Sequence, residues 1–418
     1  MVFASEVSAS EVSSRVSFQA LPCWVPAVFG RVVPPVAAGG YKAVMMSYFL
    51  PPVQMSHIAP LARLAPLAIS VDSLRNRARW APLLLSALLL LMCGCQSPLH
   101  RVHLDHPSMG TRFQITVFHS DRDHATAWVR QAWNRIDQID QVCSDWKESS
   151  ELRQLCRSAP HLKPVVVSAD LLQVMQKALE IAQASEGAFD PTVGGLVRLW
   201  RRCHRAGRLP RDHEVEKARK GMGIDGIIID EAASTIQLLR EGVAIDLGGI
   251  AKGHAVQQVF QLLERQGIRH LIIDGGGDLV LGDPPPGRRG WRIAIGASNQ
   301  QASNQQASSN ATPLKLLIAG RAAVATSGDA TGFTEIEGRR YSHILDPSSG
   351  LGIEGPHQVT VISTDGAIAD ALATAISVLE PQAAADLLRR FPGSAALLVD
   401  PSDGSHRVLG EMPLATEQ

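Results

Sequence analysis

Residues 244–253 read AIDLGGIAKG, and this order of residue types predicts a strand that runs into a helix. The apolar residues predict the strand, Gly248 and Gly249 predict the turn, and Lys252 follows on the helix. Glycines let a backbone approach a phosphate closely, and a helix N-terminus offers unpaired N–H groups. The stretch is neither a Walker A loop nor the dinucleotide-binding fingerprint. Taken alone it fits a tight strand-to-helix turn equally well.

A second motif, at residues 366–375, combines a carboxylate with a hydroxyl. Asp370 and Thr374 are four residues apart, so on a helix they share one face. Their neighbours on that face are small or apolar. Such a pair suits Mg²⁺, which takes oxygen ligands and completes its octahedron with water and substrate phosphates. The structural alternative is that Asp370 lies near a helix N-terminus and Thr374 hydrogen-bonds to the preceding turn.

A third motif, RYSHILDP at residues 340–347, places a hydroxyl, a histidine and a carboxylate after a strand. Ser342 and His343 are adjacent, so they point to opposite faces of an extended chain, which argues against a serine-hydrolase pair. His343 as a general base or a phosphate partner is the better functional interpretation. On this motif alone, a structural histidine is the simpler interpretation.

Three further stretches rich in glycine and acidic residues are weak evidence of a functional site when each is taken alone, because glycine-rich turns commonly separate helices and strands. They are GAFDPTVGG at residues 187–195, IDGGGDL at 273–279 and ATSGD at 325–329. Loops on a rigid scaffold are nevertheless where catalytic groups concentrate.

Around these motifs the chain from about residue 101 to 415 is typical of an α+β domain with packed helices. A strand is predicted where apolar residues alternate, and a helix where they recur at helical spacing. The predicted strands are 112–118, 226–229, 270–273, 291–295 and 358–362, and the predicted helices are 125–142, 169–185 (capped by Ser168) and 366–379. A polar near-repeat at residues 297–310 cannot bury a core, so we expect a mobile surface loop between two strands, without chemistry.

Composition narrows the function classes. The 418 residues include 40 basic and 40 acidic side chains, and this balance argues against a nucleic-acid partner. Aromatic residues make up only 5%, which also disfavours base stacking. The six cysteines match no zinc pattern. Cys143 and Cys156 could pair in an oxidising compartment, or could be unpaired buried thiols.

The segment 71–95 has the features of a secretory signal. Arginines precede a short apolar run that is below the ~20 residues of a membrane span. The run ends LMCGCQS, which resembles a lipobox and makes Cys95 the expected lipidated residue, with Cys93 as the alternative. An uncleaved anchor and a soluble export signal are the other possibilities. Because a signal begins so late, residues 1–70 are interpreted as sequence upstream of the true start or as a disordered extension.

Together and in this order, the motifs resemble the ApbE family, the FAD:protein FMN transferases. The resemblance extends over the chain from residue 108 to the helix of Asp370. It also includes residues 108–111 (SMGT), 199–200 (LW) and 324–328 (VATSG). It implies an ApbE-like fold of mixed and antiparallel sheets with packed helices.

The resemblance also implies the roles of individual residues. The implied FAD contacts are Met109, Trp146, Phe189, Asp190, Asp246, Lys252 and Ile344. The implied Mg²⁺ ligands are Asp370, Thr374 and the backbone carbonyl of Gly249, and His343 is the implied catalytic residue. The sequence departs from the family pattern at three places. His254 stands where the family commonly has an aromatic residue, and Asp274 stands where it commonly has asparagine. Residues 329–331 lack the aromatic residue that is usual there. These departures affect the expected flavin pocket, not the metal site.

The activity implied is Mg²⁺-dependent transfer of FMN from FAD to a Thr or Ser of a protein acceptor, with release of AMP. The acceptor would be a membrane redox subunit outside the cytoplasm, and the enzyme would be lipid-anchored on the periplasmic side. Two alternatives stay open: a magnesium-dependent FAD pyrophosphatase, and a non-catalytic flavin-binding lipoprotein. AMP release with a covalently flavinylated acceptor distinguishes the transferase from both.

Overall fold

The computed structural model describes residues 98–295, 314–318, 320–328, 333–355, 358–400 and 405–414. These ranges all belong to the second of two compact units of the chain, Leu90–Gln418. Segments 1–70 and 71–95 (with Cys95), the polar loop 297–310 and residues 329–331 lie outside the described ranges. The described part combines helices with antiparallel sheets, which confirms the predicted fold class.

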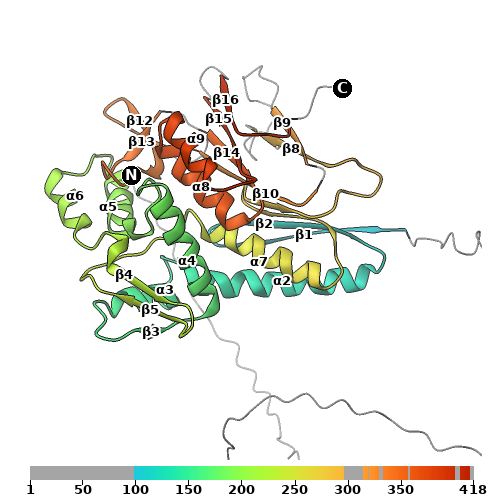
Figure 1. The fold of residues 1–418 in the computed structure, drawn as a ribbon, viewed down its shortest axis with the longest axis horizontal. Coiled ribbons are helices and arrows are strands. Elements are labelled where there is room, and N and C mark those ends of the chain that lie inside the picture. Colours follow the sequence, from blue (N-terminus) through green and yellow to red (C-terminus); the bar gives the residue numbers. More distant parts are fainter. Residues whose placement is uncertain are drawn as a thin grey trace, which may run out of the picture. The chain divides into compact units, whose positions relative to one another are not determined.

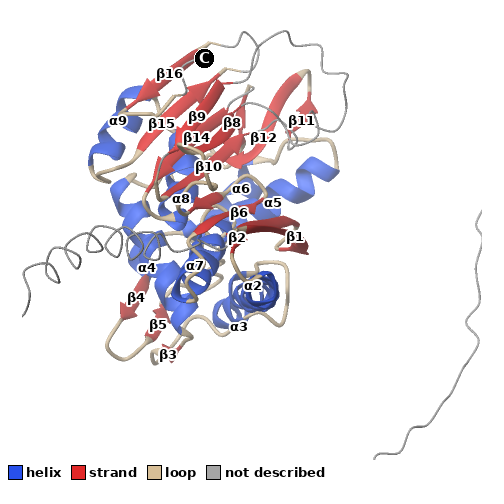
Figure 2. Cartoon of the chain, turned by 90° about the vertical axis from the view of Figure 1, so that its right-hand side faces the viewer, coloured by secondary structure: helices blue, strands red, loops and turns tan. Residues whose placement is uncertain are grey.

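The framework is an eight-stranded sheet in the order β1-β2-β6-β7-β10-β14-β15-β16 (Figure 1). Figure 2 shows these strands side by side, and every pairing among them is antiparallel. Alternate residues of β2, namely Phe113, Ile115 and Val117, are fully buried, as its sequence pattern predicts. The strands are β1 (His100–Ser108), β2 (Thr111–His119), β6 (His270–Gly275), β7 (Leu279–Leu281), β10 (Ala322–Gly328), β14 (Gln358–Ser363), β15 (Ala395–Val399) and β16 (His406–Leu409).

Three helices pack against this sheet, namely α2 (Arg122–Cys143), α7 (Ala251–Arg265) and α8 (Gly366–Val378), and a fourth, α4 (Ala169–Ala184), packs against α2 and α8. Helix α7 contacts both α2 and α8 and lies between them in Figure 1. Helix α8 also contacts β10 and β14. The largest apolar core forms where these helices meet the sheet.

Side-chain caps set where three of these helices begin. The carboxylate of Asp121 accepts the His124 N–H, so α2 starts three residues before its predicted start at residue 125. The predicted Ser168 cap of α4 is confirmed, since its hydroxyl accepts the Leu171 N–H. The carboxylate of Asp365 caps α8.

Three smaller sheets and the remaining helices complete the described structure. The sheets are β11-β12-β13, β3-β5-β4 and β8-β9. Strands β8 and β9 flank the polar loop, as expected, and they pair with each other. The elements are β3 (Val165–Val166), β4 (Ile227–Asp230), β5 (Thr235–Leu238), β8 (Trp291–Ile295), β9 (Leu314–Ile318), β11 (Phe333–Ile336), β12 (Arg339–Leu345), β13 (Gly352–Glu354), α3 (Glu151–Arg157), α5 (Gly194–Arg205), α6 (Asp212–Arg219) and α9 (Pro381–Arg389), with 3-10 turns at Pro191–Val193 and Ile224–Gly226.

The strand predicted at the start of the 244–253 motif is wrong. Residues 243–247 are extended but belong to no sheet. Their backbone groups instead bond to the turn at Pro191–Val193 and the start of α5. The Ala244 carbonyl accepts the Gly194 N–H at 2.9 Å, and the Pro191 carbonyl accepts the Asp246 N–H at 2.8 Å. The helix predicted after the glycines is confirmed as α7.

The cysteines of the described ranges are free thiols, namely Cys143, Cys156 and Cys203. The possible Cys143–Cys156 disulfide is therefore absent. Cys143 is buried in the main core, and burial raises the pKa of its thiol. Cys156 accepts the Ile245 N–H at 3.5 Å. Within the ranges described, none of the helices is both long and apolar enough to span a membrane.

Candidate active site

The centre of the site is the close approach of helices α7 and α8. Gly253 on α7 faces Gly366 on α8, and a Cβ at either position would collide with the backbone of the other helix. A Cβ at Gly253 would also lie 2.7 Å from the Cβ of Asp370. The two glycines therefore allow the N-terminal turns of both helices to touch. This contact brings the motifs 244–253 and 366–375 together.

Asp370 is 3% exposed and faces the first turn of α7. Its Oδ2 atom accepts the backbone N–H of Gly253 at 3.0 Å and lies 3.5 Å from the Nζ atom of Lys252. A buried carboxylate needs such partners, because an unpaired buried charge is costly. The other carboxylate oxygen takes part in neither contact.

Lys252 makes its shorter ion pair with a residue of the 273–279 motif to which the sequence analysis assigned no role. Its Nζ atom lies 2.6 Å from Oδ2 of Asp278, at the end of the glycine turn between β6 and β7. Burial, together with the charge of Asp370, raises the pKa of Asp278 to about 7. Burial acts to lower the pKa of Lys252, but the two carboxylates outweigh it and raise that pKa. Lys252 is therefore a permanent cation between two acidic groups.

Thr374, one turn further along α8, meets Gly249. A Cβ at Gly249 would lie 2.8 Å from the Thr374 Oγ1 atom and 3.3 Å from the ring of Phe189. On its other side, Thr374 Oγ1 lies 3.4 Å from the hydroxyl of Ser327 on β10. Asp370 and Thr374 thus share one helix face, as their spacing predicts, and both face the segment from Gly249 to Gly253.

These groups fit a magnesium ion. A carboxylate and a hydroxyl one turn apart, beside a glycine without a side chain, are oxygen donors of the kind Mg²⁺ prefers. Among the described residues there is no cluster of three or more His, Cys, Asp or Glu side chains that could hold a metal. The described residues therefore contain no cluster of thiolate or imidazole ligands for a metal such as zinc. Mg²⁺ commonly binds through one or two carboxylates plus substrate phosphates, which matches Asp370 and its surroundings.

Asp246 lies on the extended segment before Gly249. Its Oδ1 atom accepts the Gly248 N–H at 2.7 Å, whereas its buried Oδ2 atom has no hydrogen-bond partner. Burial and the nearby charge of Asp145 raise the pKa of Asp246. Buried polar atoms without a partner are rare in folded proteins and mark places where a ligand can supply the missing donor.

Trp146 is at the exposed end of the same region. Its side chain is 66% exposed, in the loop between α2 and α3. The guanidinium carbon of Arg201, on α5, lies 4.0 Å from the centroid of the Trp146 ring. Arg201 also approaches Asp246, with its Nη2 atom 3.6 Å from Oδ2. Trp146 and Asp246 are therefore joined through one arginine.

Three other predicted FAD contacts are placed by turns. Asp190 uses its Oδ1 atom to accept the N–H and the hydroxyl of Thr192 at 2.7 and 2.6 Å, so it shapes the turn before α5. Phe189, next to it, is buried against Gly249. Met109 is in the β1–β2 turn with a positive φ of 49° and packs against the main core.

His343 and Ile344 lie on β12, in a different sheet. Ser342 is buried and His343 is exposed, so the two side chains point to opposite faces as predicted. The Ser342 hydroxyl accepts the Ile344 N–H at 3.1 Å, and Ile344 is buried. Strand β12 contacts α8, the helix that carries Asp370 and Thr374. His343 thus belongs to an element beside the site.

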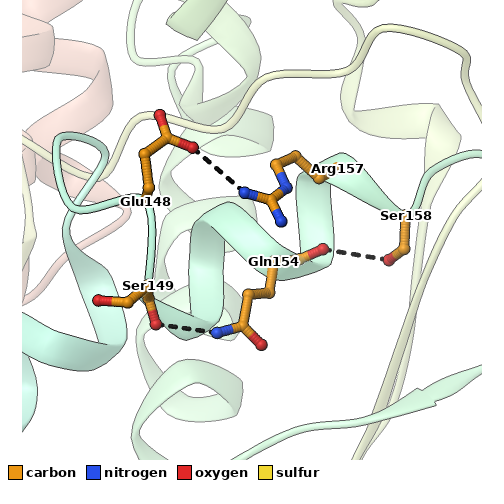
Figure 3. A pocket seen from close by; sticks show the side chains of 5 residues that line it. All are labelled: Glu148, Ser149, Gln154, Arg157 and Ser158. Atoms are coloured by element: carbon orange, nitrogen blue, oxygen red, sulfur yellow. Dashed lines mark hydrogen bonds and ion pairs between the residues drawn. The ribbon is translucent and has the colours of Figure 1, made fainter.

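A surface hollow near α3 has no feature of a reaction centre. It measures about 600 Å³ and is shown in Figure 3. Its polar groups satisfy one another: Glu148 pairs with Arg157 at 3.3 Å, and the Ser149 carbonyl accepts from the Gln154 amide at 2.9 Å. It is lined by Glu148, Ser149, Gln154, Arg157 and Ser158.

Known proteins resemble this chain in sequence over most of its described part. The model of the ApbE family matches residues 109–398. An FAD:protein FMN transferase of Vibrio cholerae is 32% identical over 297 residues, which cover 70% of this chain and 86% of that protein. One of Salmonella typhimurium is 29% identical over 339 residues, covering 77% and 92% of the two chains.

Solved structures give the same result. The flavin transferase ApbE from Vibrio cholerae has a TM-score of 0.62 and 27% identity, covering 74% of this chain and 97% of that one. The ApbE protein from Thermotoga maritima has a TM-score of 0.61 and 28% identity, covering 74% and 96%. The family match extends over more than half of the chain and includes the whole α7–α8 site, so this chain belongs to the ApbE family.

Proposed function

We propose that this protein is a magnesium-dependent FAD:protein FMN transferase that forms a phosphoester with a Thr or Ser hydroxyl of its acceptor and releases AMP. The observation that carries the proposal is the shared face of Asp370 and Thr374, packed against Gly249 and Lys252. The related proteins named FAD:protein FMN transferase support the flavin chemistry. The magnesium is inferred from the oxygen donors around Asp370, and the phosphoester bond and the release of AMP are what the family resemblance implies.

The residues around Asp370 are suited to a pyrophosphate. FAD carries two phosphate charges that repel an incoming hydroxyl. Mg²⁺ held by Asp370, Thr374 and the Gly249 carbonyl would neutralise part of that charge. Lys252 adds a cation, and Asp278 holds it in place at 2.6 Å. The first turn of α7, whose N-cap residue Ile250 makes no side-chain cap, adds the positive end of a helix dipole.

The proposed transfer is a displacement at phosphorus. The acceptor oxygen bonds to the FMN phosphorus while the bond from that phosphorus to the bridging oxygen breaks. AMP leaves with the bridging oxygen and its electron pair. The proton of the acceptor hydroxyl passes to His343, whose exposed position on β12 suits a group that meets a protein acceptor.

We also propose that Cys95 carries a lipid that anchors the enzyme to a membrane on its periplasmic side. The support is the order of the basic, apolar and small residues in segment 71–95. Strand β1 begins at His100, soon after Cys95, so a short tether would separate the lipid from the sheet. An acceptor exposed outside the cytoplasm, such as a membrane redox subunit, fits this placement.

The decisive experiment replaces the carboxylate on α8. Asp370→Asn should lower FMN transfer about a thousandfold or more, because a metal ligand is lost from the transition state. The same change at the exposed Asp386 of α9 is the matched control and should leave transfer unchanged. His343→Ala should also lower transfer. Thermal unfolding of each variant verifies that it is folded.

The assay follows AMP release by chromatography and covalent flavin by in-gel fluorescence, using FAD with and without Mg²⁺ and a candidate redox subunit. Covalent flavin on the subunit supports the transferase. The subunit used is one that a related transferase is able to flavinylate. If this subunit stays unmodified while free FMN and AMP are released, the enzyme is a pyrophosphatase. Retained FAD without AMP would identify a binding protein. Normal transfer by folded Asp370→Asn would remove the metal assignment.

A further inference from the structure

Arg201 covers one face of an exposed tryptophan. Its guanidinium carbon lies 4.0 Å from the centroid of the Trp146 ring, a distance at which a cation is attracted to the ring electrons. Trp146 is nevertheless 66% exposed. One face of the indole is therefore occupied by protein, and much of the rest of the ring is open to solvent.

The guanidinium is itself held in position. Its Nη1 atom donates to Oδ2 of Asp145 at 2.6 Å, and its Nη2 atom lies 3.6 Å from Oδ2 of Asp246. The Asp145 and Asp246 side chains are only 16% and 9% exposed. An arginine tied by mostly buried carboxylates keeps its plane fixed, unlike a surface ion pair that moves in solvent. Arg201 therefore limits where the Trp146 ring can lie.

The same arginine connects the tryptophan to the reaction centre. Asp246 is on the extended segment that leads to Gly249, which meets Thr374. The buried Oδ2 atom of Asp246 accepts no hydrogen bond. An open aromatic face and an unsatisfied buried acceptor thus lie on either side of one guanidinium, beside the proposed phosphate site. Both features suit a planar ring that carries an N–H donor.

We propose that Arg201 is a positioning residue for FAD, holding Trp146 so that its uncovered face stacks on one of the two planar ring systems of the nucleotide. This inference rests on the proposed function. The guanidinium, the indole and the FAD ring form three layers, with Asp145 fixing the outermost one. Because Arg201 contacts neither Asp370 nor Lys252 in the described structure, its effect falls on FAD binding and not on the chemical step.

The test uses two substitutions and a neighbour as control. Arg201→Ala removes the covering group, and Arg201→Lys keeps the charge but loses the planar surface. Arg202→Ala is the matched control, because Arg202 is an exposed arginine on the same helix that forms no ion pair with any residue the structure describes. Trp146→Ala and the double variant Trp146→Ala/Arg201→Ala complete a mutant cycle. Thermal unfolding verifies that each is folded.

Calorimetric titration with FAD gives the main readout. We expect the Kd to rise about fivefold to twentyfold in Arg201→Ala, less in Arg201→Lys, and not at all in Arg202→Ala. The double variant should bind no more weakly than Trp146→Ala, because Arg201 acts through that ring. In transfer assays the KM for FAD should rise with kcat within about twofold. Titrations with AMP and with FMN show which ring of FAD stacks on Trp146. Arg201→Ala should bind AMP more weakly if the adenine stacks, and FMN more weakly if the flavin stacks.

Asp145→Asn provides a second approach that leaves Arg201 in place. It should weaken FAD binding in the same direction, since the guanidinium is released. Acrylamide quenching of tryptophan fluorescence provides a further readout. The quenching due to Trp146 is the difference between a protein that carries Trp146 and the same protein with Trp146→Phe. This difference should be larger in Arg201→Ala than in the wild-type protein. An unchanged Kd in folded Arg201→Ala overturns the inference. Tighter FAD binding overturns it as well, because Arg201 would then occupy the place of the ring.

The two levels of proposal fail in different ways. If the wild-type protein does not bind FAD, the proposed function itself is lost. If wild type binds FAD and Trp146→Ala weakens binding while Arg201→Ala does not, only the role of Arg201 is lost.

Discussion

At the scale of single residues, a missing side chain matters as much as the side chains that carry the chemistry. Gly249 has no Cβ, which leaves Thr374 Oγ1 and the Phe189 ring close to its backbone. Any larger residue would enter the space between the α7 turn and α8. The motif 244–253 therefore needs its second glycine for the site, and not only for a turn.

Gly249→Ala should impair the metal site while preserving the fold. The new Cβ would lie 2.8 Å from Thr374 Oγ1 and 3.1 Å from Thr374 Cγ2, so the threonine must shift. A displacement of this kind at a reacting centre lowers rates about a hundredfold. The measurement is FMN transfer as a function of Mg²⁺ concentration. Gly320→Ala, where nothing lies within 4 Å of the new Cβ, is the control. A normal Mg²⁺ dependence in Gly249→Ala would contradict the requirement for free space between Gly249 and Thr374 at the metal site.

Spacing in the sequence predicted some of these residues and missed others. Asp370 and Thr374 share a helix face because helical geometry is local, so a four-residue interval suffices. The partner of Lys252 could not be predicted in this way. Asp278 reaches Lys252 only because the β6–β7 turn packs beside α7, and that contact depends on the tertiary fold. The Arg201–Trp146 stack likewise joins α5 to a loop distant in sequence.

At the scale of elements, the predicted helices and strands were confirmed where periodicity was strong. Helices α2, α4 and α8 appeared within a few residues of their predicted ends, and β8 at its predicted bounds. The strand predicted before Gly248 failed for a specific reason. Its apolar residues are buried, but its N–H and carbonyl groups bond to a turn near Pro191. A run of apolar residues indicates that a segment is buried. It does not show whether the backbone of that segment hydrogen-bonds to a neighbouring strand or to a turn.

A half-buried ion pair ties three helices together and should control acid stability. Asp170 on α4 accepts from Arg135 on α2 at 2.7 Å and lies 3.6 Å from His254 on α7. Burial acts to raise the pKa of Asp170, but His254 and Arg135 outweigh it and lower the pKa to about 2. The carboxylate therefore stabilises the fold fully above its ordinary value of 3.8, and this contribution is lost as the pH falls through about 2.

Asp170→Asn should accordingly lower the free energy of unfolding at pH 7 by roughly 2 kcal/mol, at ~1.4 kcal/mol per pKa unit. The difference between the wild-type protein and the variant should shrink as the pH falls from about 4 to about 2. Urea unfolding across that range measures it. Asp386→Asn, at an exposed pair on α9, should leave the curve unchanged. A gap between wild type and Asp170→Asn that stays constant with pH would contradict the linkage.

At the scale of the whole molecule, the site is assembled from segments far apart in the chain. Helix α7, helix α8, the loop after α2 and helix α5 each contribute one or two residues. The eight-stranded sheet holds α7 and α8 side by side, and the main core lies beneath them. The family resemblance, which rests on motif order, named Trp146, Lys252 and Asp370 as site residues but did not name Arg201.

A chain that begins at Pro98 should therefore keep the fold and the site. All strands of the eight-stranded sheet begin at or after His100, and the buried apolar residues of the described ranges begin at Val102. We expect the FAD Kd of this shortened chain to stay within about twofold of the full chain, and its thermal midpoint within a few degrees. The full chain, expressed in a bacterium, should partition with membranes, while the shortened chain and full-length Cys95→Ala should stay in the soluble fraction. Sedimentation followed by immunoblotting measures this distribution. If Cys95→Ala still sediments with membranes, the lipid is not what holds the enzyme there. If the shortened chain loses FAD binding, residues before Pro98 contribute to the site, and the self-sufficiency of the α7–α8 centre is disproved.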